Sequence, residues 1–255
     1  MKTISIFSLK GGTGKTVSTS NIAYNLAALH GKRVLLIDCD KQGDSSRLYN
    51  RHDETLPSIS DVLTEENYDI TRAIRNTDYS RLDILPANMD LLIANRRILT
   101  DCMRAQQPRL HEALSTIADA YDFCLIDCAP DFTMTVINAL VASDYIAIPL
   151  KVDRFIFDGM PQLLKQLQTV RAFNPGLKIL GTFLTMYYRS GVTEQGEDYI
   201  RSVQSKFNLP VLRTIIRRTT KVDQSTFAGP LLTYAPKSTA AQDYIALTKE
   251  ILELC

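Results

Sequence analysis

The chain has 255 residues, of which 45% are hydrophobic and 22% are charged, and its formal net charge is +1 at pH 7. This composition is typical of a globular protein with a sizeable core, and it excludes an overall basic field for nucleic acid, so any such site has to be local. The 5 cysteines contain no C-x-x-C pair, which favours reduced thiols over a disulfide or zinc framework.

Targeting and membrane signals are absent from the sequence. No apolar run approaches the roughly 18 residues that a membrane-spanning helix needs. The apolar stretch SIFSL near the N-terminus is too short for the core of a signal peptide and runs directly into glycines and a lysine. The sequence therefore indicates a cytoplasmic protein.

Strand-like and helix-like segments alternate along the chain. Apolar strand-like runs occupy 3–8, 33–40, 82–87, 121–130, 145–152 and 177–186. Helical patterns occupy the stretch GKTVSTSNIAYNLAALHG, which Gly31 ends, and about 105–119, 133–142, 158–173, 194–206 and 239–254. This alternation predicts an α/β protein with a mostly parallel, twisted sheet flanked by helices on both faces. Ligands of such sheets bind beyond the carboxyl ends of the strands.

The segment 41–104 is less regular than the rest of the chain. It is polar, rich in Asp, Glu, Arg and Asn, and has too few apolar residues for a core of its own. We therefore predict one domain over residues 1–255, with 41–104 as an irregular helical insertion on the main sheet.

A glycine-rich loop, KGGTGKT, follows the first predicted strand and opens the first predicted helix. Glycines 11, 12 and 14 let successive N–H groups point at one anion, and the positive end of the helix faces the same place. Lys15 is expected to reach the β- and γ-phosphates of a nucleotide, and the Thr16 hydroxyl to ligate Mg²⁺. The strict pattern G-x-x-x-x-G-K-[ST] is not met, because residue 9 is Leu, and the loop carries a second lysine, Lys10.

Aspartates close two of the apolar runs. Asp38 and Asp40 end VLLIDCD, and Asp127 ends FCLID. Because the carboxyl ends of parallel strands share one edge of the sheet, these carboxylates are expected beside the glycine loop, where they would support Mg²⁺.

These motifs together resemble the ParA/MinD superfamily. KGGTGKT resembles its deviant Walker A motif, VLLIDCDKQGDSS resembles its LLIDxDPQG segment, and LIDCAP resembles its Walker B motif. The likeness covers nearly the entire chain, because TMTVINALVASDYIAIPLK and LLTYAPKSTAAQDYIALTKEI are similar to segments of chromosomal and plasmid partition ATPases. No helix-turn-helix precedes the first strand, so the resemblance is to the short, Soj-like type.

The resemblance implies an ATPase that binds ATP and Mg²⁺ and forms a homodimer around two ATP molecules. In such a dimer Lys10 acts on the partner's nucleotide, Lys15 acts within its own chain, and Asp40 orients the attacking water. The expected nucleotide-binding residues are Lys10, Gly11, Gly12, Thr13, Gly14, Lys15, Thr16, Val17, Arg217 and Thr219, and the expected metal-site residues are Thr16, Asp38 and Asp127. Two departures from the family are Lys41 in place of a proline and Arg217-Arg218-Thr219 in place of PRN near the adenine.

The resemblance also implies nonspecific DNA binding, association with the nucleoid, and a ParB-like centromere-binding partner that stimulates hydrolysis. The segment 209–222 carries four cations and no acid, which suits phosphate contacts. The expected DNA-binding residues are Arg189, Arg217, Arg218 and Lys221. A membrane anchor is not expected, because the C-terminal helix mixes acids with Lys249 and is not a basic amphipathic helix.

Other functions share some of these features. A positioning ATPase for a non-DNA cargo, or a MinD-like regulator, would carry the same motifs. An electron carrier would use Cys124 and Cys128 to hold an iron–sulfur cluster between subunits. A tyrosine kinase would need more tail tyrosines than Tyr234 and Tyr244. A binding module without turnover would follow if Lys41 disturbed the loop that carries Asp40.

Overall fold

The computed structural model of the chain describes residues 1–151, 156–188 and 202–255. In these residues a seven-stranded sheet has the order β3-β4-β2-β5-β1-β6-β7. Its strands are β1 (Lys2–Ile6), β2 (Val34–Cys39), β3 (Arg75–Asn76), β4 (Leu82–Leu85), β5 (Phe123–Cys128), β6 (Tyr145–Lys151) and β7 (Lys178–Thr185). All neighbouring strands are parallel except β3, which runs antiparallel to β4 at the edge. The predicted α/β class with a mostly parallel sheet is confirmed.

The neighbouring strands β2 and β5 are buried along their whole length. Continuous apolar runs of this kind form strands that are covered on both faces. In the parallel register Asp38 lies opposite Asp127, and Cys39 lies opposite Cys128. The two aspartates therefore meet at the carboxyl edge of the sheet.

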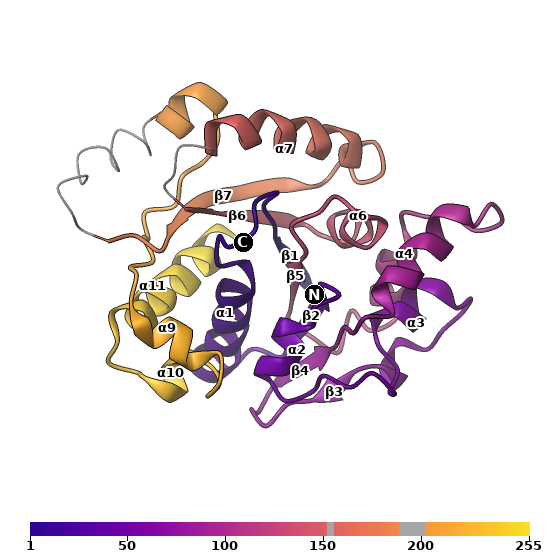
Figure 1. The fold of residues 1–255 in the computed structure, drawn as a ribbon, viewed down its shortest axis with the longest axis horizontal. Helices are drawn as coiled ribbons and strands as arrows, with labels where there is room; N and C mark the ends of the chain where they lie inside the picture. The colour runs from indigo at the N-terminus through magenta and orange to yellow at the C-terminus, as the bar shows by residue number, and fades with distance from the viewer. Residues whose placement is uncertain (152–155, 189–201) are drawn as a thin grey trace.

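Helices cover both faces of the sheet (Figure 1). One core contains Ile22, Leu26, Leu36, Leu247 and Ile251 under α1 (Lys15–His30), α9 (Thr220–Ser225), α10 (Leu231–Tyr234) and α11 (Thr239–Leu254). The other contains Leu35, Ile37 and Ile126 under α3 (Ile59–Thr64), α4 (Leu91–Thr100), α5 (Arg109–Ser115), α6 (Met134–Val141) and α7 (Ile156–Arg171). Two further short helical elements are α2 (Asp44–Leu48) and η1 (Ile70–Arg72).

The segment 41–104 packs on the main sheet. Its buried residues Ile59, Leu63, Leu91 and Ile98 belong to the same core as the buried residues of β2 and β5. It contains α2, α3, η1 and α4, and it also contributes β3 and β4 to the sheet. The two-residue β3 is too short to leave a pattern in the sequence.

One predicted helix is shorter in the structure, and another lies mostly outside the described residues. The pattern at 105–119 forms a helix only over Arg109–Ser115, which begins directly after Pro108. Most of the helix predicted at 194–206 lies outside the described residues, because these resume at 202.

Candidate nucleotide-binding site

The glycine loop joins β1 to α1 at the carboxyl edge of the sheet. Gly12 and Gly14 have φ values of 69° and 79°, in the left-handed region that favours glycine. A Cβ added at Gly11 or Gly12 would meet no atom within 4 Å, so this side of the loop is open. Gly14 is the N-cap of α1, and the first N–H groups of a helix have no acceptor within it, so this end of α1 is suited to binding an anion.

Hydrogen bonds fix the far side of the loop. The Thr13 hydroxyl lies 2.8 Å from the hydroxyl of Ser8, and the Thr185 hydroxyl donates to the Thr13 carbonyl at 2.8 Å. Thr185 ends β7, so its side chain ties the loop to a strand that lies 172 residues away in the sequence. The loop is therefore held in shape by contacts that leave its open side available.

The two lysines of the loop lie in different surroundings. Lys15 is only 7% exposed, and its Nζ donates to the Lys10 carbonyl oxygen at 3.0 Å. Burial lowers the pKa of Lys15, while the negative charge of Asp127 and other nearby acids acts in the opposite direction. Lys10 is half-buried and lines a hollow of about 50 Å³ with Ser8 and Thr13.

Asp38 and Asp127 are both fully buried at the ends of β2 and β5. Asp38 accepts hydrogen bonds from the Ser46 N–H at 2.9 Å, the Ser46 hydroxyl at 2.7 Å and the Asp40 N–H at 3.1 Å. Burial raises the pKa of Asp38 above its ordinary value despite these bonds. Burial and the neighbouring charge of Asp38 raise the pKa of Asp127 as well, while the hydroxyls of Ser45 and Thr16 act against that rise.

One oxygen of Asp127 marks a place for a cation. Its Oδ1 is buried and has no hydrogen-bond partner among the described residues, while its Oδ2 accepts from the Ser45 hydroxyl at 2.8 Å. The described residues contain no group of three His, Cys, Asp or Glu side chains that would cage a metal by themselves. This arrangement fits Mg²⁺, which prefers oxygen ligands and completes its shell with water and phosphate oxygens. Thr16 and Asp127 are the residues that would support it.

Ser45 and Ser46 are site residues that the sequence prediction missed. They lie on α2, directly after the segment that carries Asp40, and they hold Asp127 and Asp38 respectively. The Ser46 hydroxyl also accepts the N–H of Ala87 at 3.0 Å. The sequence gives only a weak signal for them, which is that two serines follow the strand-end aspartates in VLLIDCDKQGDSS.

Asp40 lies on a turn that leaves β2. Its carboxylate accepts the Gln42 N–H at 3.0 Å, and its carbonyl accepts the Gly43 N–H at 2.9 Å. A cavity of about 190 Å³ lies against this turn and is lined by Asp40, Lys41, Gln42, Asp131 and Thr133, among others. Lys41 thus places a cation in this cavity where the family has a proline.

A larger cavity of about 250 Å³ lies next to the start of α1. Its lining includes Gly14 and Val17 from the loop and helix, and Arg217, Arg218 and Thr219 from the segment before α9. The structure therefore brings the predicted nucleotide-binding residues Val17, Arg217 and Thr219 to the glycine loop. The size of the cavity and its position suit a nucleoside whose phosphates reach the loop.

The predicted basic cluster is partly neutralised by α11. Arg217 forms an ion pair with Asp243 at 2.6 Å, and this contact raises the pKa of the guanidinium. Arg213 is paired with Glu250 and Glu253 of the same helix. The segment 209–222 contains no acid of its own, so its sequence alone overstated its positive charge.

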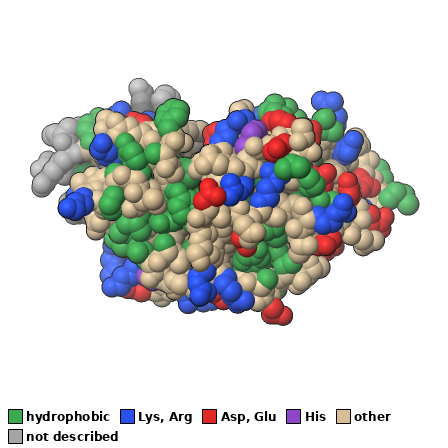
Figure 2. All heavy atoms as spheres, turned by 90° about the horizontal axis from the view of Figure 1, so that it is seen from below, with side chains coloured by type: hydrophobic (Ala, Val, Ile, Leu, Met, Phe, Trp, Pro, Cys, Tyr) green, Lys and Arg blue, Asp and Glu red, His purple; other side chains and the backbone are tan. Residues whose placement is uncertain are grey.

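The remaining predicted DNA-binding residues have different positions. Arg218 is exposed and lines the larger cavity. Lys221 donates to Gln224 at 3.0 Å and lies 5.8 Å from the ring centroid of Tyr234. Arg189 lies outside the described residues. On the face shown in Figure 2, basic side chains lie among acidic ones and do not form one continuous basic surface.

The cysteines occupy two kinds of position. Cys39, Cys124 and Cys128 are buried in the core, and burial raises the pKa of Cys128 to about 12. Cys102 is exposed after α4, and Cys255 is partly buried, which raises its pKa to about 11. Cys124 and Cys128 do not offer the surface thiolates that an iron–sulfur cluster shared between subunits requires.

None of the helices within 1–151, 156–188 and 202–255 is long and apolar enough to cross a bilayer. The apolar side of α11 faces the core, because Tyr244, Leu247 and Ile251 are buried there.

The open glycine loop, the buried Lys15 and the paired strand-end carboxylates define a P-loop nucleotide-binding protein with a parallel sheet. A family model described as an AAA domain matches residues 1–179. The chain therefore belongs to this AAA-domain family and, as its motifs predict, to the ParA/MinD group of P-loop ATPases.

Two relatives cover almost the whole chain. The sporulation initiation inhibitor protein Soj of Bacillus subtilis is 34% identical over 253 residues, which are 98% of this chain and 98% of Soj. The chromosome partitioning protein ParA of Caulobacter vibrioides is 33% identical over 257 residues, covering 99% of this chain and 94% of ParA.

Two solved structures share the fold over the same extent. Cobyrinic acid a,c-diamide synthase from Mycobacterium smegmatis, with bound ATP analog and magnesium, has a TM-score of 0.85 and 28% identity, covering 99% of this chain and 95% of that one. The cell division ATPase MinD of Pyrococcus furiosus has a TM-score of 0.78 and 26% identity, covering 100% and 99%. The chain is thus a ParA-like ATPase.

Proposed function

We propose that this chain is a partition ATPase, which binds ATP with Mg²⁺, dimerises around the nucleotide, binds DNA nonspecifically in that state and is reset by hydrolysis. The observation that carries the proposal is the buried pair Asp38 and Asp127 beside Lys15 and Thr16. Buried carboxylates with raised pKa values next to an open phosphate loop are costly unless a cation belongs there. The similarity to the chromosome partitioning protein ParA supports the role in partition.

The residues of the site have separate roles in nucleotide binding. The N–H groups of the loop and the Lys15 ammonium hold the phosphates, and Thr16, Asp127 and Asp38 are the residues that would hold Mg²⁺. Bound Mg²⁺ supplies positive charge against the transferring phosphoryl group. The nucleoside occupies the cavity beside Val17, Arg217 and Thr219.

Dimerisation and hydrolysis depend on the open side of the loop. Gly11 and Gly12 leave room there for close approach of a second chain. Lys10 acts on the nucleotide of that second chain, so that the dimer forms only when the terminal phosphate is present. Asp40, on its turn beside the 190 Å³ cavity, orients the attacking water.

DNA binding uses the cations that α11 leaves unneutralised, chiefly Arg218 and Lys221, with Arg189 from outside the described residues. Dimerisation doubles this weak site and raises its avidity. In this role the protein is associated with the nucleoid, and a ParB-like centromere-binding protein stimulates its hydrolysis.

Co-sedimentation with nonspecific DNA tests the proposal, using ATP, ADP or no nucleotide at two salt concentrations. We expect retention with ATP alone and weaker retention at the higher salt concentration, because phosphate contacts release counterions. Arg218→Glu should lose retention, and a direct measurement of ATP binding separates this loss from any effect on the cavity that Arg218 also lines. The matched charge reversal Arg97→Glu, at an exposed position of α4, should keep retention. Retention of Arg218→Glu equal to that of the wild type would contradict the assignment.

Sedimentation velocity tests the role of Lys10. Lys10→Ala should bind ATP but lose ATP-dependent dimerisation and hydrolysis, whereas Lys178→Ala, an exposed lysine at the start of β7, should behave as wild type. Asp40→Ala should accumulate the ATP-bound dimer. A Lys10→Ala dimer of unchanged stability would refute action across the interface.

A positioning ATPase for a non-DNA cargo is the second candidate. It is favoured by the pairing of Arg213 and Arg217 with acids of α11, which reduces the basic surface. ATP-dependent dimerisation without DNA retention by the wild type would select it.

A further inference from the structure

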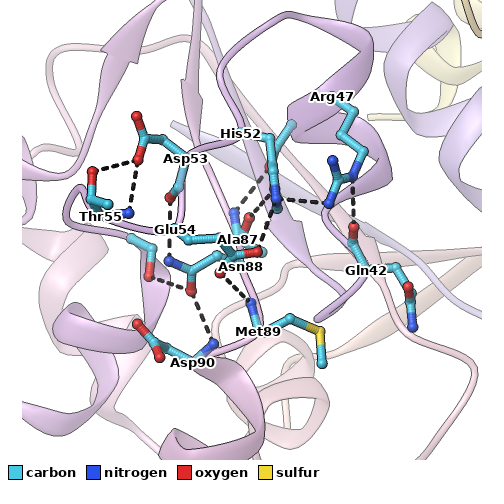
Figure 3. Close-up of polar contacts among 12 residues, drawn as sticks. Gln42, Arg47, His52, Asp53, Glu54, Thr55, Ala87, Asn88, Met89 and Asp90 are labelled. Carbon is cyan, nitrogen blue, oxygen red and sulfur yellow. Dashed lines mark hydrogen bonds and ion pairs between the residues drawn. The ribbon is translucent and has the colours of Figure 1, made fainter.

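His52 lies at the centre of a polar network beside α2 (Figure 3). Its side chain is only 11% exposed. The ring nitrogen Nδ1 lies 3.2 Å from the Ala87 carbonyl oxygen. The other ring nitrogen, Nε2, lies 2.8 Å from Nη2 of Arg47 and 3.1 Å from Oε1 of Glu54. All hydrogen-bonding positions of the ring are therefore engaged.

The two contacts of Nε2 exclude each other. A carbonyl oxygen only accepts, so Nδ1 carries a proton in both charge states of His52. A guanidinium only donates, so Arg47 bonds to Nε2 only while the ring is neutral. A carboxylate only accepts, so Glu54 bonds to Nε2 only once the ring is protonated. Protonation therefore exchanges Arg47 for Glu54.

Arg47 connects this ring to the turn that carries Asp40. Its Nε donates to the Gln42 carbonyl at 3.3 Å, and its backbone N–H donates to the Gly43 carbonyl at 2.8 Å. Gln42 and Gly43 in turn donate their N–H groups to Asp40. A guanidinium held by His52 thus fixes the turn, and a guanidinium beside an imidazolium is repelled from it.

Close packing makes the ring part of this turn. Gly43 has a φ of 66°, and a Cβ at this position would lie 2.5 Å from Nδ1 of His52 and 2.9 Å from the Ala87 oxygen. Only glycine fits between the turn and the ring. Movement of the ring is therefore transmitted to the turn.

Glu54 connects the ring to the loop before α4. Its Oε2 accepts the Met89 N–H at 3.2 Å, and α4 begins two residues later at Leu91. Leu91 lines the same 190 Å³ cavity as Asp40. The charged groups that face His52 are Arg47 from α2 and Asp53 and Glu54 from its own loop, while the loop before α4 meets it with the Ala87 carbonyl.

We propose that His52 is a positioning residue for Asp40. The neutral ring accepts a hydrogen bond from Arg47, and this bond fixes the turn that carries Asp40. The protonated ring donates to Glu54 instead, and the turn is no longer held by Arg47. Protonation of the ring therefore slows hydrolysis. This rests on the proposed role of Asp40 in orienting water.

The tautomer of His52 is the first test, and it needs no nucleotide. The chain has 3 histidines, so long-range ¹H–¹⁵N spectra of the ¹⁵N-labelled protein resolve them, with His30→Gln and His111→Gln for assignment. We expect His52 to carry its proton on Nδ1 at pH 8. A proton on Nε2 at pH 8 would mean that the ring already binds Glu54, and the proposal would be overturned.

The pH profile of ATP hydrolysis is the second test. His52→Gln keeps an acceptor for Arg47 and does not titrate, so the ratio of wild-type to His52→Gln rates should fall about 3- to 10-fold from pH 8 to pH 5.5, the size of one hydrogen bond. His52→Asn keeps only the bond to Ala87 and should be slow at both pH values. His111→Gln, on the exposed side of α5, should keep the wild-type profile.

The Glu54→Gln variant sharpens the result. Without the carboxylate that stabilises the imidazolium, the acid loss of activity should begin at lower pH than in the wild type. Thermal unfolding of each variant identifies a loss that comes from misfolding. A ratio of wild-type to His52→Gln rates that does not change with pH overturns the proposal. If the protein has no ATPase activity but His52 carries its proton on Nδ1, the proposed function is refuted, while the exchange of Arg47 for Glu54 at the ring still stands.

Discussion

The two ends of β5 carry aspartates in opposite circumstances. Asp122, just before the strand, accepts hydrogen bonds from the backbone N–H and the guanidinium of Arg33, both at 2.8 Å. This pairing lowers the pKa of Asp122 to about 2. Asp127, inside the other end, is fully buried, has an oxygen without a partner among the described residues, and has a raised pKa.

The difference separates residues that stabilise the fold from residues that serve the ligand. Asp122 favours the folded state because its charge is compensated by Arg33 at the surface. Asp127 disfavours the folded state because burial beside Asp38, without a full set of donors, opposes its ionisation. Departures from the usual rules of polar satisfaction concentrate at functional sites, and here one strand shows both behaviours.

Replacement of Asp127 gives the largest expected effect and tests whether this residue serves the ligand and not the stability of the fold. Asp127→Asn should reduce ATP hydrolysis by about 100-fold or more, because the anionic support of the metal site is lost. The free energy of unfolding without nucleotide should not decrease, because the substitution removes the cost of burying a carboxyl whose ionisation is opposed. Steady-state ATPase assays and urea denaturation measure the two quantities. A large loss of stability would show that this end of β5 is also structural.

Replacement of Ser46 gives an intermediate effect and tests whether its hydroxyl supports Asp38. Ser46→Ala removes the hydroxyl that donates to Asp38 and accepts the Ala87 N–H. The free energy of unfolding should therefore decrease by about 1–3 kcal/mol. Hydrolysis should fall about 10-fold, the usual effect of losing a residue that orients a metal-site carboxylate. Ser115→Ala, an exposed serine on α5, is the control for urea denaturation and ATPase assays. Equal behaviour of the two variants would contradict the role of Ser46.

Replacement of Asp122 gives the smallest effect and concerns acid stability. The folded pKa of about 2 lies below the ordinary value of 3.8, so Asp122 contributes stability above pH 4 that is lost as pH falls toward 2. Asp122→Asn should change the melting temperature at pH 7 by no more than about 3 °C, because the pair is exposed. The difference from wild type should vanish near pH 2, and hydrolysis should be unchanged. Melting curves of both proteins between pH 2 and pH 7 measure the difference in melting temperature. A difference that grows toward pH 2 would contradict the stabilising role of Asp122.

The features that were predictable from the sequence are local in the chain. Continuous apolar runs predicted β2 and β5, and the glycine loop between β1 and α1 predicted the phosphate site. The strand-end position of Asp38 and Asp127 was enough to place them together, because parallel strands share their carboxyl edge.

The features that were missed depend on partners distant in the sequence. Arg217 and Asp243 are 26 residues apart, so nothing in the basic segment 209–222 signals its neutralisation by α11. His52 meets Ala87 across 35 residues, and its role depends on which atoms surround the ring. Ser46 is near Asp38 in sequence, but only the fold of α2 shows that its hydroxyl donates to that carboxylate and also accepts from Ala87.

The unequal burial of the cysteines gives this protein a natural labelling position. A maleimide dye reacts with thiolates, so at neutral pH it should attach first to the exposed Cys102 and spare the core thiols. Cys102 follows α4, whose first turn borders the same cavity as Asp40. Fluorescence from the unmutated chain would therefore report on this helix during the ATPase cycle.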